Sequence, residues 1–229
     1  MTTPKSIPKS DSQEIRRGIA LLLEPGGVYE FRAFGRGTTS GYFTDFNKLA
    51  QAVAGVSGKV PACYFTINPV DPDLLARAAN RLQDFARTTT NDLQIVKRRW
   101  LPIDFDPVRP AGISSTDAEH EAAIDRAREC REWLAGRGWP DPVFIDSGNG
   151  AHLLYPVELP NDEAATQDMS KALQALAFKF DDVAVAVDTG NFNPARIWKI
   201  PGTLAMKGDN TPERPHRLSR ILEAPAWSK

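Results

Sequence analysis

Apolar positions recur with helical spacing in five stretches of this chain. We predict helices at residues 11–26, 44–53, 71–85, 116–136 and 162–180. Asp11 and Thr116 each stand three positions before a glutamate, which is the pattern of a capping box at a helix start. Pro72 suits the first turn of the third helix. The expected apolar face of that helix consists of Leu74, Leu75, Ala78, Leu82 and Phe85.

Shorter apolar runs, rich in β-branched and aromatic residues, separate the predicted helices. We predict strands at residues 28–34, 60–67, 100–107, 143–145, 153–155, 183–187 and 196–200. The Gly-rich stretch 35–41 and the polar stretch 88–92 are predicted as loops. Because helices alternate with strands and hairpins, we expect an α+β fold with a mixed or antiparallel catalytic sheet.

Two carboxylates stand near the end of the predicted strand 100–107. Alternate side chains of a strand share a face, so Asp104 and Asp106 are expected on one face and Phe105 on the other. Like charges this close repel each other unless a cation lies between them, and carboxylate oxygens suit Mg²⁺ or Mn²⁺. Two solvated aspartates at a strand end are the alternative interpretation.

A Gly-rich turn joins the predicted strands 143–145 and 153–155. The turn consists of Ser147, Gly148, Asn149, Gly150, Ala151 and His152. Glycines tolerate positive φ and close approach of the backbone, and the N–H groups of such a turn can bind an anion. Ser147 adds a hydroxyl and His152 an imidazole to the same place. An ordinary hairpin with a surface histidine is the alternative.

A third carboxylate follows the apolar run 183–187. Asp188 stands at the exit of this predicted strand, where it would complete a metal site begun by the other two acids. Arg196 and Lys199 lie on or near the next strand. Cations beside a carboxylate–metal cluster suit a triphosphate. The alternative is a core strand followed by a polar loop with surface ion pairs.

These motifs, in this order, resemble those of the archaeo-eukaryotic primase superfamily, in particular its primase-polymerase branch found in phages, plasmids and mobile elements. That family carries an acidic Asp-x-Asp/Glu motif, a Ser-x-His-type motif and a third acidic residue. They correspond here to the Asp-x-Asp strand, the Gly-rich turn and Asp188. The stretches 64–69 (YFTINP) and 196–203 (RIWKIPGT) also look like those of phage and plasmid members. The resemblance covers residues 60–220.

The resemblance implies a DNA primase or DNA-directed polymerase, a nucleotidyl transferase that makes or extends primers on single-stranded DNA from NTPs or dNTPs. Asp104, Asp106 and Asp188 would hold two ions, Mg²⁺ or Mn²⁺, which activate the attacking 3′-hydroxyl and stabilise the leaving pyrophosphate. The residues that would contact the incoming nucleotide are Ser147, Gly148, Asn149, Gly150, His152, Arg196, Lys199 and Lys207.

The resemblance also implies the fold and a partner. We expect the archaeo-eukaryotic primase fold, in which an RRM-like catalytic sheet packs with an N-terminal α/β lobe. Residues 1–10 are expected to be a disordered leader, and residues 11–229 a single catalytic domain with lobes at 11–90 and 91–229. A replicative helicase, acting in cis or in trans, is the expected protein partner, since the chain has no Walker A sequence.

Because the net charge of the chain is −1, a groove for nucleic acid requires that basic residues cluster locally. Residues 189–229 hold seven Lys or Arg against three acids, so we expect weak binding of a single strand. The further candidates for contacts to nucleic acid are Lys97, Arg98, Arg99 and Arg109. Arg109 equally suits a structural ion pair with Asp106.

The overall composition is that of a soluble globular chain, with 41% hydrophobic and 25% charged residues. No apolar run reaches the about 20 residues that a membrane span needs, so we expect a cytoplasmic protein without membrane contact. Cys63 and Cys130 are far apart and are expected as free thiols. No Cys-x₂-Cys or Cys/His cluster occurs in the sequence, so no zinc site is expected, unlike in relatives with a zinc-binding module.

Two other functions are compatible with parts of this pattern. A metal-dependent glycosyltransferase also uses Asp-x-Asp, but it needs neither the Gly-rich turn nor Asp188, and the sequence shows no nucleotide-binding βαβ half. A non-catalytic module that binds single strands or replication origins would have no chemical reason to keep all three acids and His152. The sequence leaves open the choice between ribo- and deoxynucleotides, and between primer initiation and extension.

Overall fold

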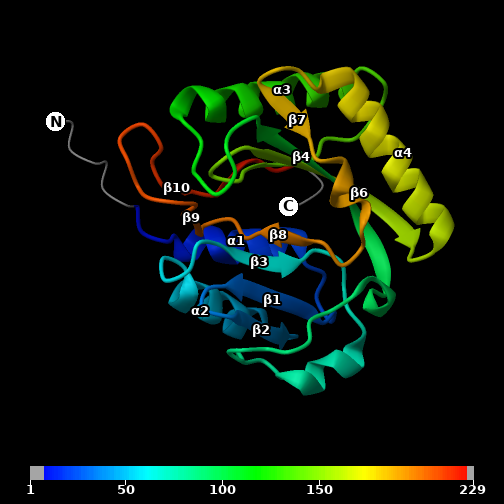
Figure 1. Cartoon of the computed structure of the whole chain (residues 1–229). Helices are drawn as coiled ribbons and strands as arrows, with labels where there is room; N and C mark the ends of the chain where they lie inside the picture. The colour runs from blue at the N-terminus through cyan, green and yellow to red at the C-terminus, as the bar shows by residue number, and fades with distance from the viewer. Residues whose placement is uncertain (1–7, 226–229) are drawn as a thin grey trace.

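The computed structural model describes residues 8–225 and shows a mixed α+β architecture with antiparallel sheets (Figure 1). Within these residues one sheet has the strand order β2 (Thr38–Phe43), β1 (Tyr29–Phe34), β3 (Cys63–Thr66) and β8 (Ile197–Lys199). A larger sheet has the order β11 (Arg220–Glu223), β5 (Val143–Asp146), β6 (Ala151–Pro160), β4 (Lys97–Pro107) and β7 (Val185–Val187). A ribbon of β9 (Leu204–Ala205) and β10 (Arg217–Leu218) adjoins them.

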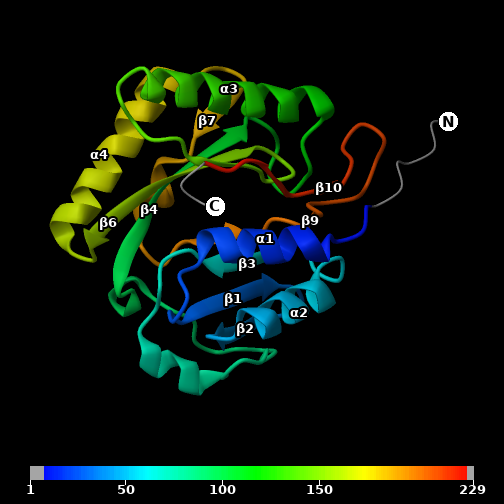
Figure 2. The same ribbon diagram turned by 180° about the vertical axis from the view of Figure 1, so that it is seen from behind.

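Four α-helices of the described segment are distributed over the two sheets. The helices α1 (Ser12–Leu22) and α2 (Phe46–Val56) lie beside the four-stranded sheet, whereas α3 (Asp117–Ala135) and α4 (Glu163–Phe180) cover the outer face of the five-stranded sheet (Figures 1 and 2). None of the helices in the described part of the chain has the length and apolar character needed to cross a membrane. The predicted free thiols Cys63 and Cys130 are both buried and unpaired.

Alternation along β4 separates two hydrophobic cores. Trp100 packs into the core that α1 forms with the two sheets, whereas Ile103 and Phe105 pack beneath α3 and α4. Burial of each large apolar side chain contributes about 1.5–3 kcal/mol. The inner core consists chiefly of Ile15, Ile19, Leu22, Phe31, Phe65, Val143, Ile145 and Leu154. The even-numbered face of β4, which holds Asp104 and Asp106, is therefore the face turned away from α3 and α4.

Side-chain caps begin the helices where the sequence predicted them. Thr116 Oγ1 accepts a hydrogen bond from Glu119 N at 3.1 Å, and Glu119 Oε2 accepts one from Thr116 N at 2.8 Å, which confirms the capping box of α3. Asp11 caps α1, but the predicted box there is wrong in its second half. Glu14 instead accepts from Ile221 N at 2.6 Å and so ties α1 to β11.

The predicted loop at residues 35–41 is wrong, because most of it belongs to β2. The β1–β2 register runs from Phe34 opposite Thr38 to Tyr29 opposite Phe43. Gly35 N donates to Gly37 O at 3.0 Å, so the turn is confined to residues 35–37. Serine and threonine are compatible with a strand when a neighbour supplies the backbone pairing, which composition alone does not reveal.

The predicted helix at residues 71–85 is also wrong beyond its first turns. Only Pro72–Arg77 is helical, as the 3₁₀ segment η1. The chain that follows pairs with the edge of β2, where the backbones of Ser40 and Gln83 exchange hydrogen bonds of 3.0 and 2.7 Å. Phe85, expected on the apolar face, is 71% exposed. The backbone of this segment therefore pairs with the otherwise unpaired edge of β2, although its local sequence favours a helix.

The other predicted elements occur with shifted ends. The strand predicted at 183–187 begins only at Val185, and Val183 is 95% exposed. The four-stranded sheet includes β8, so it draws on both stretches that were predicted as separate lobes. Residues 1–7 of the predicted leader lie outside the described residues.

The Gly-rich turn offers a test of packing against β4. A Cβ atom on Gly150 would lie 2.2 Å from the carbonyl oxygen of Phe105, which is backbone and cannot rotate away. Gly150→Ala should therefore lower the free energy of unfolding by about 2 kcal/mol, measured by chemical denaturation.

The matched control for this prediction is Gly55→Ala in α2. A Cβ there meets nothing within 4 Å, and alanine favours a helix over glycine by about 0.5–1 kcal/mol. A Gly150→Ala variant as stable as this control would contradict the tight contact between the turn and β4.

Candidate functional site

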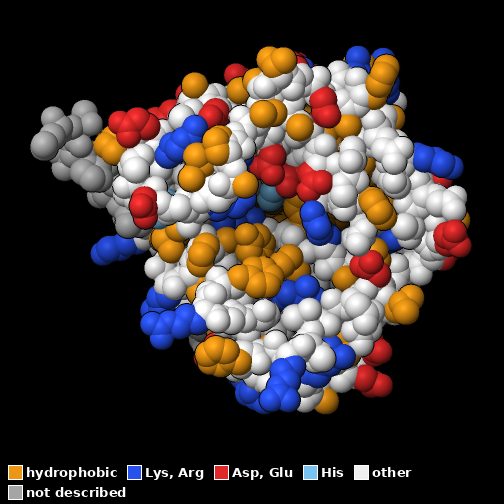
Figure 3. All heavy atoms as spheres, in the orientation of Figure 1, with side chains coloured by type: hydrophobic (Ala, Val, Ile, Leu, Met, Phe, Trp, Pro, Cys, Tyr) orange, Lys and Arg blue, Asp and Glu red, His pale blue; other side chains and the backbone are white. Residues whose placement is uncertain are grey.

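A cavity of about 340 Å³ opens between the two sheets. In Figure 3 acidic side chains and a histidine lie at the centre of the hollowed face, with basic and then hydrophobic side chains below them. The cavity is lined by Phe34, Tyr64, Asp104, Asp106, Ser147, Asn149, His152, Asp188, Asn191, Arg196, Ile197, Trp198, Lys199 and Lys207. The candidate residues from three separate stretches of sequence therefore meet in one place.

The carboxyl groups of Asp104, Asp106 and Asp188, called the three site carboxylates below, reach the cavity from two adjacent strands. β4 pairs with β7 in antiparallel register, and Asp188 N donates to Asp104 O at 3.0 Å just beyond the end of β7. Asp188 also caps the 3₁₀ segment η3 (Thr189–Phe192) by accepting a hydrogen bond from Gly190 N at 2.8 Å. The backbone of β4 thus fixes the position of Asp188.

Burial and like charge disfavour the ionised form of the central carboxylate. Burial raises the pKa of Asp104 well above its usual range, and the negative charges of Asp106 and Asp188 act in the same direction. The charges of Lys207 and Arg196 oppose this effect only in part. A bound cation is therefore the partner that would restore the ionised form of Asp104.

His152 faces Asp104 directly across the β4–β6 pair. Its Nε2 lies 3.4 Å from Asp104 Oδ1, and its ring packs edge-on against Trp198 with centroids 4.8 Å apart. Burial lowers the pKa of His152 to about 3, and the charge of Lys199 acts in the same direction, so the imidazole is neutral at physiological pH. Its Nδ1 is buried and has no hydrogen-bond partner in the described residues.

The Gly-rich turn is held mainly by contacts with the protein itself. Ser147 Oγ accepts from Gly150 N at 3.0 Å, and Asn149 Oδ1 accepts from Ser115 N at 2.9 Å. Gly148 has a φ of +88°, which confirms the need for glycine at this position. Ser147 and Asn149 still line the cavity, whereas Gly148 and Gly150 do not.

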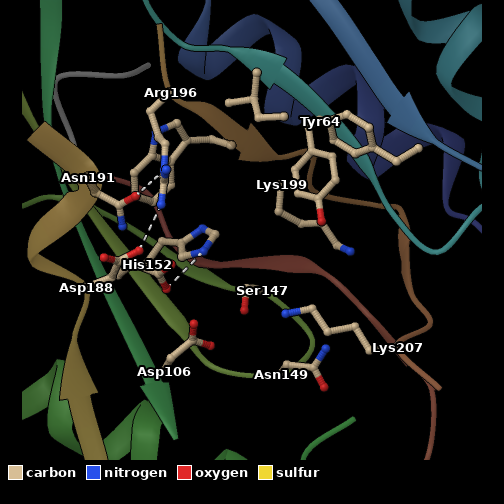
Figure 4. A pocket seen from close by; sticks show the side chains of 14 residues that line it. Tyr64, Asp106, Ser147, Asn149, His152, Asp188, Asn191, Arg196, Lys199 and Lys207 are labelled. Atoms are coloured by element: carbon tan, nitrogen blue, oxygen red, sulfur yellow. Dashed lines mark hydrogen bonds and ion pairs between the residues drawn. The ribbon is translucent and has the colours of Figure 1, made fainter. Parts of the chain in front are cut away.

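Arg196 and Asn191 form a small network with the third carboxylate (Figure 4). Arg196 Nη2 donates to Asp188 Oδ2 at 3.1 Å, and Arg196 Nε donates to Asn191 Oδ1 at 2.7 Å. Asn191 is buried, and its Nδ2 has no partner in the described residues. Apart from its place between Asp188 and Arg196, no signal in the sequence marks Asn191 as a site residue.

Lys199 and Tyr64 approach from the side opposite Asp106 and Asp188 in Figure 4. They are cross-strand partners on β8 and β3. Lys199 Nζ donates to Leu204 O at 3.1 Å, and burial lowers the pKa of Lys199 to about 7, with Lys207 acting in the same direction. Arg196, Lys199 and Lys207, called the three site cations below, thus surround the cavity that holds the acids. Phe34 and Trp198 also line the cavity, and no local pattern marks them because their positions depend on sheet pairing.

The four residues predicted to contact nucleic acid all make contacts within the fold. Arg98 is 3% exposed and donates to Phe192 O and Thr166 Oγ1, each at 2.6 Å. Arg99 donates to Leu22 O at 2.8 Å, and Lys97 pairs with Glu24 and Glu158. None of the three lines the cavity.

Arg109 has the structural role that was its alternative interpretation. It lies 3.5 Å from Asp106 and donates to Ile113 O and Pro107 O at 3.2 and 3.1 Å. Its side chain is largely buried. All four residues thus make contacts within the fold, and their contacts to nucleic acid stay a prediction.

The chemistry of the donor set fits a hard divalent cation, although the side chains do not form a closed cluster. Within residues 8–225, no group of three or more His, Cys, Asp or Glu side chains is arranged to hold a metal ion. Asp188 is instead paired with Arg196. Three carboxylates in one cavity, one of them half-buried beside two like charges, are nevertheless the ligands that Mg²⁺ and Mn²⁺ prefer.

Comparison with known proteins gives little further information. No protein-family model matches the chain, and no curated protein matches it. Among solved structures, the polymerase domain of ligase D from Mycobacterium tuberculosis, in complex with DNA, is similar with 16% identity and a TM-score of 0.44. That match covers 95% of this chain and 86% of the other chain. The similarity is too low to assign the chain to a family.

Lys199 offers a test of the electrostatics of the site. The ordinary lysine pKa of 10.5 falls to about 7 in the folded protein, so between these values the unfolded state binds one more proton. Stability therefore rises with pH from about 7 to 10 and is lowest below pH 7. Lys199→Met should raise the free energy of unfolding at pH 7 by about 2–4 kcal/mol and flatten that rise.

Chemical denaturation at several pH values measures both effects. Lys171→Met, on the exposed face of α4, removes a lysine that forms no ion pair with the described residues, and it should leave the pH dependence unchanged. If the stability of Lys199→Met still rose steeply with pH, another group would be the cause, and Lys199 would be charged in the folded protein.

Proposed function

We propose that this chain is a template-directed nucleotidyl transferase that makes or extends primers on single-stranded DNA, a primase-polymerase of the archaeo-eukaryotic primase superfamily. The observation that carries the proposal is the convergence of the three site carboxylates and the three site cations on one cavity. Acidic and basic side chains around one open space suit a ligand that carries both negative phosphates and divalent ions.

The proposal extends to the architecture. The five-stranded antiparallel sheet, with α3 and α4 on one face and the site carboxylates on the other, would be the RRM-like catalytic sheet of that superfamily. The four-stranded sheet with α1 and α2 would be the N-terminal lobe, to which β8 returns. A replicative helicase would act with this domain in cis or in trans.

The site cations are proposed to bind the triphosphate of the incoming nucleotide. Lys199 stands at the balance point between its neutral and charged forms, and an anionic ligand would raise its pKa and favour the ammonium form. Arg196 is already oriented by Asn191, and its guanidinium can turn from Asp188 to a phosphate oxygen. Lys207, exposed on the loop after β9, is free to reach into the same space.

His152 is proposed to contact the nucleotide as a neutral imidazole. Burial lowers the pKa of His152 to about 3, which favours the neutral ring at neutral pH. The buried Nδ1 without a partner is a polar atom that a ligand group would satisfy. The edge-on contact with Trp198 fixes the orientation of the ring.

The site carboxylates are proposed to hold Mg²⁺ or Mn²⁺. When bound, these ions would supply the charge that lowers the pKa of a 3′-hydroxyl and stabilises the leaving pyrophosphate. The protein itself contributes by positioning the carboxylates. β4 holds two of them, and the hydrogen bond from Asp188 N to Asp104 O places the third. Release of Asp188 from Arg196 would free its carboxylate for an ion at the same time as it frees Arg196 for phosphate.

Replacement of two carboxylates tests the proposed catalysis. Asp104→Asn with Asp106→Asn should reduce nucleotide incorporation on a primed single-stranded template by about 1000-fold or more, because the ions would lose two of three ligands. Folding should be unaffected or slightly stabilised at pH 7, because repulsion among the acids is relieved.

Asp73→Asn with Asp168→Asn is the matched control, since both acids are exposed and outside the cavity. It should incorporate nucleotides at the rate of the unmodified protein. Absence of incorporation by the unmodified protein with either ion, with ribo- and deoxynucleotides and with a supplied primer would favour a non-catalytic binding module.

Replacement of the histidine tests the nucleotide contact separately. His152→Asn should weaken binding of a non-hydrolysable nucleoside triphosphate by about tenfold, since it removes one hydrogen bond to a charged group. Titration calorimetry with the nucleotide and, separately, with Mn²⁺ distinguishes the two ligands. Weakened Mn²⁺ binding with unchanged nucleotide binding would assign His152 to the metal instead.

A further inference from the structure

Arg98, Arg99 and Arg109 are largely buried among contacts within the fold, so other, exposed cations are better placed to contact a nucleic-acid strand. Two shallow hollows, of about 290 and 260 Å³, lie beside β2 and the segment after η1. Figure 3 shows Lys and Arg side chains gathered on this lower part of the face, below the acidic centre. These hollows are separate from the cavity that holds the site carboxylates.

A continuous line of residues connects the hollows to the candidate active site. Phe34 lines the main cavity, where its ring lies 6.0 Å from that of Tyr64, and the next residue, Gly35, lines the first hollow. Phe85 lines both hollows. The surface therefore leads from the cavity past Phe34 and then past Phe85.

The basic residues of this surface have no acidic partners. Arg36 and Lys59 line the first hollow and Arg87 lines the second. All three are exposed, and none forms an ion pair with a residue between 8 and 225. The one acid lining the hollows, Asp84, already accepts a hydrogen bond from Thr39 at 2.7 Å. Although the chain as a whole has a net charge of −1, this surface is locally positive.

Phe85 is exposed, and its backbone adopts an unfavourable conformation. It has a φ of +55°, which bulky residues rarely adopt, and 71% of it is accessible to solvent. Its ring packs against Gly37, where a Cβ atom would approach it to 2.7 Å. Phe34 is also 46% exposed. Two exposed aromatic rings among unpaired cations are the combination that binds single strands, by stacking on bases and by attraction to phosphates.

We infer that Phe34, Arg36, Lys59, Phe85 and Arg87 form an aromatic–basic track that guides single-stranded nucleic acid to the cavity. The inference rests on the proposed function for its choice of ligand. A duplex would present phosphates but no free base faces, so the exposed rings favour a single strand. The track takes the place of the predicted patch at Lys97, Arg98 and Arg99.

Binding of a fluorescein-labelled oligothymidylate, followed by anisotropy with the full chain, tests the track. Arg36→Gln with Arg87→Gln should raise the Kd about tenfold and make the dependence of log K on log salt shallower by about 0.7 for each phosphate contact removed. The control, Lys171→Gln with Arg220→Gln, makes the same charge change on exposed residues outside both hollows, and its Kd should stay within about twofold of the original.

The aromatic part of the track has its own control. Phe85→Ala should raise the Kd for the oligothymidylate at least about fivefold but leave duplex binding unchanged. Phe178→Ala, which removes an even more exposed ring from α4, should change neither. Kd values unaffected by the track variants, or equal losses for single strand and duplex with no effect of Phe85→Ala, would overturn the inference.

The proposed function and the track fail in different ways. A protein that binds single strands through these residues but incorporates no nucleotide would refute the proposed activity and leave the track standing. A protein that incorporates nucleotides but binds the oligothymidylate equally well without Arg36, Arg87 or Phe85 would refute the track alone.

Discussion

Antiparallel pairing along β4 is the constraint on which the whole site depends. β6 on one side places His152 opposite Asp104, and β7 on the other side delivers Asp188 at the end of the same strand. Strand alternation then sends Phe105 beneath α3 and α4 while the carboxylates face the cavity. A shift of this register by one residue would turn the acids into the apolar core, where they would have no partner.

Burial disfavours the charged forms of three groups around the cavity. Burial holds His152 neutral, lowers the pKa of Lys199 to about 7 and raises the pKa of Asp104. Well-packed apolar side chains at the same positions would be more stable. Strain of this kind is typical of sites that are completed by a ligand, here one that brings both positive and negative charge. Among the site carboxylates, Asp188 is paired with Arg196 and Asp106 with Arg109, whereas no arginine or lysine of the described residues forms an ion pair with Asp104.

The four-stranded sheet contributes the opposite wall and the approach to it. β3 and β8 present Tyr64 and Lys199 to the cavity, and the β1–β2 turn continues the surface outward past Phe34. The edge of β2 is covered by the irregular chain after η1, which places Phe85 and Arg87 on the exposed side. The segment that covers the edge of β2 therefore also forms part of the surface that we assign to a nucleic-acid strand.

The sequence by itself determined the elements whose signals are local. Alternation revealed the common face of Asp104 and Asp106, and Thr116 with Glu119 marked the start of α3, because both effects act within a few residues. Only the tertiary structure decided which basic side chains are exposed. Arg98 has the sequence context of a ligand contact, but it is hydrogen-bonded to Phe192 and Thr166. The tertiary structure also decided that residues 78–83 pair with β2 rather than continue a helix. Backbone hydrogen bonds and desolvation between segments far apart in sequence outweigh local preference, and no local pattern records them.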